Sequence, residues 1–352
     1  MQRIFLTLAI APIQLLWLTF GGVEIGRAAI VPAPFSDIIV PNELATKDGN
    51  AATMVPYLDD HDVPIGRPAY IGPFHYQQVY RASEFMTLPR GGAFLTVLAT
   101  HRADCLSPAP FPGQVATNVT ITLSTTLKDP DGLSVSFMEN QGTDAIVVTN
   151  GLRIGAGGGK IGCPNPTDST LRAFELPIPF FYDPSRGNLL LDLKSTGLTD
   201  PFHSGRFDPA FADAQSILGD SVSRVYSHSL SSPLAEFSDT VGLVSYFQFR
   251  PFPRIYATLE TNTVVIAWPT QPVPFKLQWS NGNLPGIQWA TYPGTIEVGF
   301  LYSVTTLPQA TLTKSRYFRL FWNTPQPGVP QVTPASLEPM PAEQITTPTS
   351  TP

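Results

Sequence analysis

Charged residues are scarce in this chain of 352 residues. Asp, Glu, Lys and Arg together make 14%, and the net charge at pH 7 is −6. Nucleic-acid binding needs clustered Lys and Arg against the phosphate backbone, and the sequence has no such cluster. We therefore expect no nucleic acid among the partners. Hydrophobic residues make 43% of the chain, which is too many for a disordered protein and enough for a substantial core.

Long apolar runs are also lacking, apart from one at residues 4–20. Arg3 precedes this run, and the small residues Ala28 and Ala29 follow it. This order is typical of a secretory signal peptide, which we expect over residues 1–29; the alternative is an uncleaved membrane anchor. With nothing else apolar enough to span a bilayer, we expect a secreted, periplasmic or cell-surface protein that is not integral to the membrane after cleavage.

Cysteine is rare, with two residues, Cys105 and Cys163, in the whole chain. Neither has the companion ligands that a zinc site needs. An exported protein folds in an oxidising compartment, where an even number of cysteines suggests a bridge. We expect a disulfide between Cys105 and Cys163, and the alternative is a pair of unrelated thiols.

Glycine and proline, in contrast, are abundant, with 27 and 37 residues. Proline cannot donate to a helix or a central strand, so this content favours short strands joined by turns. The clearest strand covers residues 118–126, where Val119, Ile121 and Leu123 alternate with Thr and Ser. Alternation of this kind marks a strand with one buried face. Repeated short strands without helices predict an all-β fold of the sandwich or jelly-roll kind.

The pattern predicts two domains and a tail. Residues 30–252 read as a β-sandwich or jelly-roll-like domain, and residues 253–322 as a small Ig-like or fibronectin-like β module of five short strands. Residues 323–352 are rich in Pro and Thr and read as disordered. Within the first domain we expect a strand over 241–249. We also expect a tight turn at Asn150-Gly151, and a polar excursion over 197–240 with one short helix near 209–217.

Several segments carry a resemblance to known families. Tyr76-Gln-Gln-Val-Tyr80 and the stretch from Tyr182 to Asp192 resemble uncharacterised secreted bacterial β-sandwich proteins, many of which end in a PEP-CTERM sorting tail. Val265-x-x-Trp-Pro269 and Tyr317-Phe-Arg-Leu320 resemble a small β module appended to exported bacterial proteins. The resemblance implies export and all-β architecture. It implies no activity, and because the sorting tail is missing here, no mode of anchoring is carried over.

Metal-ligand patterns are weak. The densest acidic cluster is Asp59, Asp60 and Asp62, and oxygen ligands in such a loop could bind calcium. Asp129 and Asp131 are a second candidate pair, although both are also common turn formers. The alternative for both groups is a solvated loop. None of the five histidines is spaced from another as metal ligands are. We therefore expect no cofactor other than, at most, calcium.

Four tryptophans fall within the predicted small module: Trp268, Trp279, Trp289 and Trp322. Exposed aromatic rings stack on sugar rings, whereas buried ones fill a core, and the sequence leaves both open. The absence of a catalytic signature favours a non-enzymatic exported protein with a structural or binding role, with glycans or surface and matrix components as partners. The alternative is a carbohydrate-binding module. A hydrolase on a sandwich scaffold comes third; it stays open because catalytic residues that lie far apart in the sequence form no recognisable motif.

The cysteine pair gives the first testable prediction. Cys105→Ser in the oxidised protein should lower the free energy of unfolding by about 4 kcal/mol, because closing a loop of this length removes entropy from the unfolded chain. Urea unfolding measures this change. The same substitution compared under reducing conditions is the control, and it should have little effect there. Two reactive thiols in the unreduced native protein would contradict the bridge.

Overall fold

The computed structural model describes most of the strands of this chain and their nearest turns. The described residues are 19–20, 23–24, 35–54, 72–100, 115–155, 173–199, 211–260, 262–271, 275–280, 288–299, 302–308 and 317–322. The chain divides into a larger unit within residues 34–252 and a smaller unit within residues 253–323. Two paired strands, β1 (Thr19–Phe20) and β2 (Val23–Glu24), group with the smaller unit.

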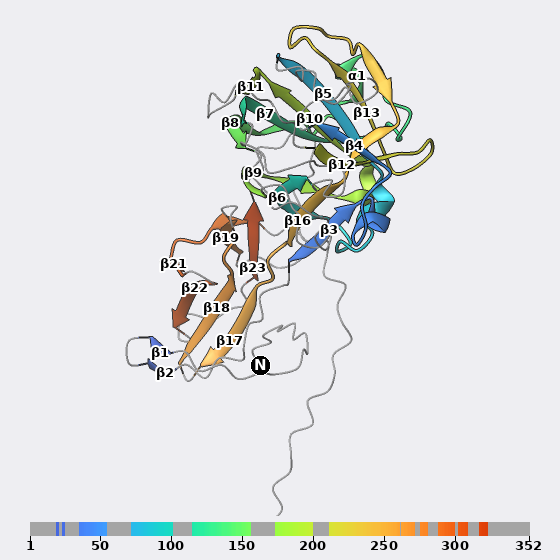
Figure 1. Ribbon diagram of the computed structural model, residues 1–352. Helices are drawn as coiled ribbons and strands as arrows, with labels where there is room; N and C mark the ends of the chain where they lie inside the picture. Colours follow the sequence, from blue (N-terminus) through green and yellow to red (C-terminus); the bar gives the residue numbers. More distant parts are fainter. Residues whose placement is uncertain are drawn as a thin grey trace, which may run out of the picture. The chain divides into compact units, whose positions relative to one another are not determined.

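Three antiparallel sheets make the larger unit (Figure 1). The seven-stranded sheet has the order β11 (Gly197–Thr199), β7 (Val115–Thr126), β10 (Asn188–Ser195), β5 (Phe74–Tyr80), β13 (Val222–Ser227) and β14 (Phe237–Asp239), with β8 (Ile146–Gly155) also paired to β7. The four-stranded sheet has the order β3 (Ser36–Val40), β16 (Ser245–Pro251), β6 (Ala93–Thr100) and β9 (Phe174–Tyr182). The three-stranded sheet has the order β15 (Val241–Leu243), β12 (Phe211–Ser216) and β4 (Ala51–Met54).

Helical structure within the described residues is confined to single short turns. These are η1 (Asn42–Leu44), η2 (Ala82–Phe85), α1 (Phe137–Asn140) and η4 (Pro184–Arg186).

The core of the larger unit is built from both the seven-stranded and the four-stranded sheet. On β7 the side chains of Val119, Ile121 and Leu123 are fully buried in this core, as their alternation predicts. From the four-stranded sheet, Leu95 and Phe247 belong to the same cluster. Antiparallel sheets that share one apolar core form a β-sandwich. The predicted all-β, sandwich-like fold is therefore confirmed.

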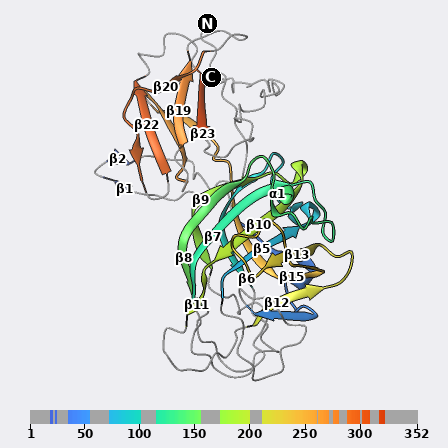
Figure 2. The ribbon, with the colours of Figure 1, turned by 90° about the horizontal axis from the view of Figure 1, so that it is seen from above.

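The long strands β7 and β8 lie side by side (Figure 2). The tight turn predicted at Asn150-Gly151 is wrong, because β8 continues through both residues. Between Thr149 and Leu152, β8 has one more residue than the paired stretch of β7, and Gly151 has a φ of 72°. The segment is a β-bulge, and glycine accepts the positive φ that other residues avoid.

The helix predicted near residues 209–217 is also wrong, since the described part of that segment is the strand β12. Ala212 and Ala214 alternate along it with the buried polar residues Asp213 and Gln215. Alanine favours helices in isolation. Here β12 pairs with β4 on one side and with β15 on the other. Hydrogen bonds to these two strands satisfy its backbone N–H and C=O groups in place of a helix.

The strand predicted over 241–249 is two strands in different sheets. β15 ends at Leu243 in the three-stranded sheet, and β16 begins at Ser245 in the four-stranded sheet. Val244 between them is fully buried, and its N–H donates to the carbonyl oxygen of Asp213 at 2.9 Å. One continuous segment therefore joins two of the three sheets.

The smaller unit has two antiparallel sheets of its own. One has the order β17 (Tyr256–Glu260), β18 (Thr263–Pro269), β22 (Tyr302–Pro308) and β21 (Glu297–Val298). The other has the order β20 (Ala290–Thr291), β19 (Phe275–Ser280) and β23 (Tyr317–Trp322). Both sheets contribute to its core cluster, with Ile266, Trp268 and Leu307 from the first and Leu277 from the second. The strands β17 and β21 are not among those predicted from the sequence.

Phe85 gives a test of the core of the larger unit. Its ring is fully buried and lies 5.1 Å from the ring of Tyr182, 5.5 Å from that of Phe247 and 5.8 Å from that of Phe249, between centroids. Phe85→Ala should lower the free energy of unfolding by about 3–5 kcal/mol, because it leaves a cavity among these rings. Met86→Ala, whose side chain is 74% exposed, is the matched control and should change it by less than about 0.5 kcal/mol in urea unfolding. Equal losses in the two variants would contradict this core.

Candidate functional site

The four tryptophans of the smaller unit occupy different environments. Trp268 is 3% exposed and Trp322 is 8% exposed, so neither presents a ring face to a ligand. Trp279 is half-buried and lies on the same side of β19 as the core residue Leu277. Trp289 is half-buried and directly precedes β20. Only Trp289 lies on the side of its sheet that faces away from the core of the unit.

Arg319 organises the outer side of this three-stranded sheet. It is the Cα partner of Gln278 on β19, and its Nε donates to the Oε1 atom of Gln278 at 2.7 Å. Its guanidinium carbon lies 4.4 Å from the ring centroid of Trp289 and 5.6 Å from that of Phe321. The cation therefore contacts two aromatic rings, an arrangement that is attractive for electrostatic reasons.

Six residues on the outward side of this sheet form what we call the Trp289 face; five come from β19 and β23, and Trp289 directly precedes β20. Its members are Lys276, Gln278, Trp289, Tyr317, Arg319 and Phe321. All are half-buried except Lys276, which is exposed. Partial burial lowers the pKa of Arg319, but an arginine remains charged at neutral pH. The face combines flat apolar rings with a fixed cation and an amide, a mixture suited to an amphipathic ligand.

Several predicted residues lie outside the described parts of the chain. These are the acidic cluster Asp59, Asp60 and Asp62 and the cysteines Cys105 and Cys163. The calcium site and the disulfide therefore stay predictions, as does most of the predicted signal peptide.

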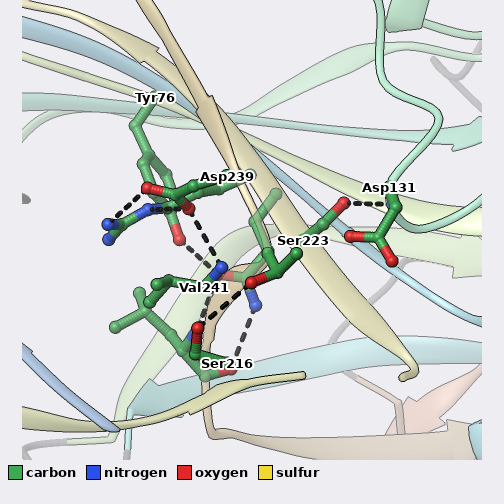
Figure 3. Close-up of polar contacts among 10 residues, drawn as sticks. Tyr76, Asp131, Ser216, Ser223, Asp239 and Val241 are labelled. Carbon is green, nitrogen blue, oxygen red and sulfur yellow. Dashed lines mark hydrogen bonds and ion pairs between the residues drawn. The ribbon is translucent and has the colours of Figure 1, made fainter. Parts of the chain in front are cut away.

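Asp129 and Asp131 are described, and each side chain has a structural partner. Oδ1 of Asp129 accepts a hydrogen bond from Nδ2 of Asn188 at 3.1 Å. The N–H of Asp131 donates to Oγ of Ser223 at 2.7 Å, as Figure 3 shows, and its Oδ2 accepts from the N–H of Gly219 at 2.7 Å. Within the described ranges, no group of three or more His, Cys, Asp or Glu side chains is placed to hold a metal ion.

A buried ion pair lies at the edge of the seven-stranded sheet. Arg224 on β13 is 1% exposed, and its Nε and Nη2 donate to the two carboxylate oxygens of Asp239 at 2.8 and 2.9 Å. Figure 3 shows Asp239 beside Tyr76, and burial raises the pKa of the Tyr76 phenol well above its ordinary value. The polar excursion predicted around β13 is wrong, because all six residues of this strand are buried. The pairing of Arg224 makes that burial possible.

The outer face of the same sheet carries a second polar cluster, around His75 and Asp192. Nε2 of His75 lies 3.0 Å from Oδ1 of Asp192, and both side chains are almost fully buried. Gln77 and Gln141 donate to Oδ2 of Asp192 at 2.6 and 2.8 Å. Phe137 of α1 stacks on the imidazole with 3.6 Å between ring centroids. The short helix thus covers the polar cluster around His75, which would otherwise be exposed to solvent.

The protonation chemistry of this cluster follows from its contacts. Burial raises the pKa of Asp192, but the hydrogen bond and charge of His75 and the bonds from Gln77 and Gln141 outweigh it, and the pKa stays below its ordinary value. Nδ1 of His75 is buried and has no hydrogen-bond partner among the described residues. No Ser, Thr or Cys described in the structure bonds to His75, so the pair lacks a nucleophile there.

Trp289 is a candidate in the sequence, whereas its neighbours in the Trp289 face were not predicted. The stretch Tyr317-Phe-Arg-Leu-Phe-Trp322 is apolar except for Arg319, and a lone cation in an apolar strand marks its outward face. Nothing in the sequence indicates that His75 and Asp192 pair, because they are 117 residues apart.

Comparison with known proteins adds no relative: no family model, curated protein or solved structure matches this chain. As for membrane crossing, the described parts of the chain include no helix with the length and hydrophobicity to span a bilayer.

Asp192→Asn should lower the free energy of unfolding by about 3–5 kcal/mol at neutral pH, because it breaks a buried pair. The pKa of Asp192 is lower in the folded protein than the ordinary value of an aspartate carboxyl. Its contribution is therefore full above that value and is lost as the pH falls through the folded pKa. Urea unfolding from pH 7 to pH 2 should show the gap between wild type and variant narrowing below about pH 4.

Glu139→Gln is the matched control for this experiment, since Glu139 is an exposed carboxylate on α1. It should change the free energy of unfolding by less than about 0.5 kcal/mol at neutral pH. A gap for Asp192→Asn that stays constant down to pH 2 would show that the ionised carboxylate is not what stabilises the fold.

Proposed function

We propose that this is an exported, non-enzymatic β-sandwich protein that binds carbohydrate at the cell surface or in the surrounding matrix. The observation that carries the proposal is the Trp289 face. It places three aromatic rings, an arginine and an amide on the outward side of one small sheet. Export rests on the order of residues at the N-terminus and on the resemblance to secreted β-sandwich proteins.

A sugar ring has an apolar face and a rim of hydroxyl groups, so it suits a surface that offers both kinds of contact. Trp289 and Phe321 provide flat apolar area with few rotatable bonds. Arg319 and Gln278 provide donors and an acceptor beside them. Because Arg319 already contacts both rings and Gln278, the side chains are ordered before a ligand arrives, and less entropy is lost on binding.

A hydrolase receives less support from the described residues. The His75–Asp192 pair would be its centre, but Phe137 covers the imidazole and no nucleophile bonds to it within the described ranges. We therefore place the function at the Trp289 face.

A glycan array probed with the full chain, with calcium and with EDTA, tests the proposal. We expect reproducible binding that survives EDTA, because the Trp289 face has no carboxylate among its members to hold calcium. Trp289→Ala should weaken binding at least about tenfold through the lost ring contact. The matched control is Phe237→Ala, which removes an exposed aromatic ring from the larger unit and should leave binding unchanged.

Three outcomes would count against this function. Absence of binding to every glycan, at concentrations that detect weak lectins, would overturn it. Binding that EDTA abolishes would move the site to a calcium centre and away from Trp289. Equal loss in Trp289→Ala and Phe237→Ala would show that the ring contact is not specific.

A further inference from the structure

Arg319 is held in place along its length, while its terminal nitrogens have no hydrogen-bond partner within the described residues. The ring contacts with Trp289 and Phe321 and the bond from Nε to Gln278 are its only interactions with the described residues. As far as the described part of the chain goes, the N–H groups of Nη1 and Nη2 are thus placed to donate to a ligand. The planar fork of a guanidinium matches a carboxylate through two parallel N–H···O bonds.

The charge of the Trp289 face is opposite to that of the whole protein. The chain has a net charge of −6, yet this face carries Arg319 and Lys276. The described residues of β19, β20 and β23 include no Asp or Glu. Lys276 lies two residues from Gln278 on the same side of β19, and its Cα partner on β23 is Phe321. Two cations with no described acid on their sheet complement an anionic ligand.

We propose that the ligand is a polysaccharide containing uronic acid. One sugar ring packs against Trp289, and its carboxylate accepts the two N–H groups at the tip of Arg319. Lys276 attracts a further carboxylate of the same chain. This inference rests on the proposed function and specifies its ligand class.

The test compares oligogalacturonate with the same oligosaccharide after methyl esterification of its carboxyl groups. The full chain is titrated with each by calorimetry at low and at physiological salt. We expect the acid form to bind at least about tenfold more tightly, with a preference that shrinks as salt screens the charges. Arg319→Gln should remove the preference, and Arg319→Lys should retain only part of it, because lysine keeps the charge without the fork.

Lys47→Gln is the matched control, because it removes an exposed positive charge from the larger unit. It should leave the preference for the acid form unchanged. Circular dichroism of each variant reports whether it is folded. If Arg319→Gln does not fold, the loss of preference in Arg319→Lys and the salt dependence of the wild type decide the question.

The outcomes separate this inference from the function on which it rests. Equal affinity of the wild type for the two oligosaccharides, lost in Trp289→Ala, overturns the uronic acid ligand and leaves carbohydrate binding in place. No binding to either form or to any glycan on the array overturns both. Tighter binding to dextran sulfate than to oligogalacturonate overturns the carboxylate assignment in favour of a sulfated ligand.

Discussion

Burial of β5 on both faces is the constraint on which the larger unit depends. All seven of its residues are buried. Tyr76 and Tyr80 belong to the core of the unit, while His75 and Gln77 alternate to the opposite face. Polar side chains buried there need partners, since an unsatisfied donor or acceptor costs about 1–3 kcal/mol. Asp192 from the adjacent strand bonds to both, and α1 covers the cluster. Both α1 and the hydrogen-bond network are thus required because β5 has no solvent-exposed face.

The strands that could be predicted were those with one buried apolar face and those whose residues are nearly all apolar. Residues 118–126 alternate cleanly, and the leucines of β10 form a continuous apolar run, so both are visible without tertiary information. β13 was missed because Ser and Arg make it look like a loop. Its burial depends on the pairing of Arg224 with Asp239, and pairing partners cannot be read from composition. β12 was missed because alanine carries a helical preference that strand pairing overrides.

The candidate site was predictable in kind but not in detail. Four tryptophans in a small module indicate either a core or a platform for sugars. Which tryptophan serves which purpose depends on strand register, since a shift of one residue exchanges the two faces of a sheet. The structure assigns Trp268 to the core and Trp289 to the outer side. The contact between Trp289 and Arg319 joins a residue just before β20 to a residue of β23, and only the folded sheet brings them together.

The passage of one segment from β15 to β16 has a consequence for how the larger unit comes apart. Because Val244 is fully buried at the point where the chain changes sheet, neither sheet can detach without pulling the other out of register. The segment is a direct covalent connection between the three-stranded and the four-stranded sheet. Sheets that are connected in this way unfold together. We therefore expect cooperative unfolding of this unit, with no state in which one of these sheets stays folded alone.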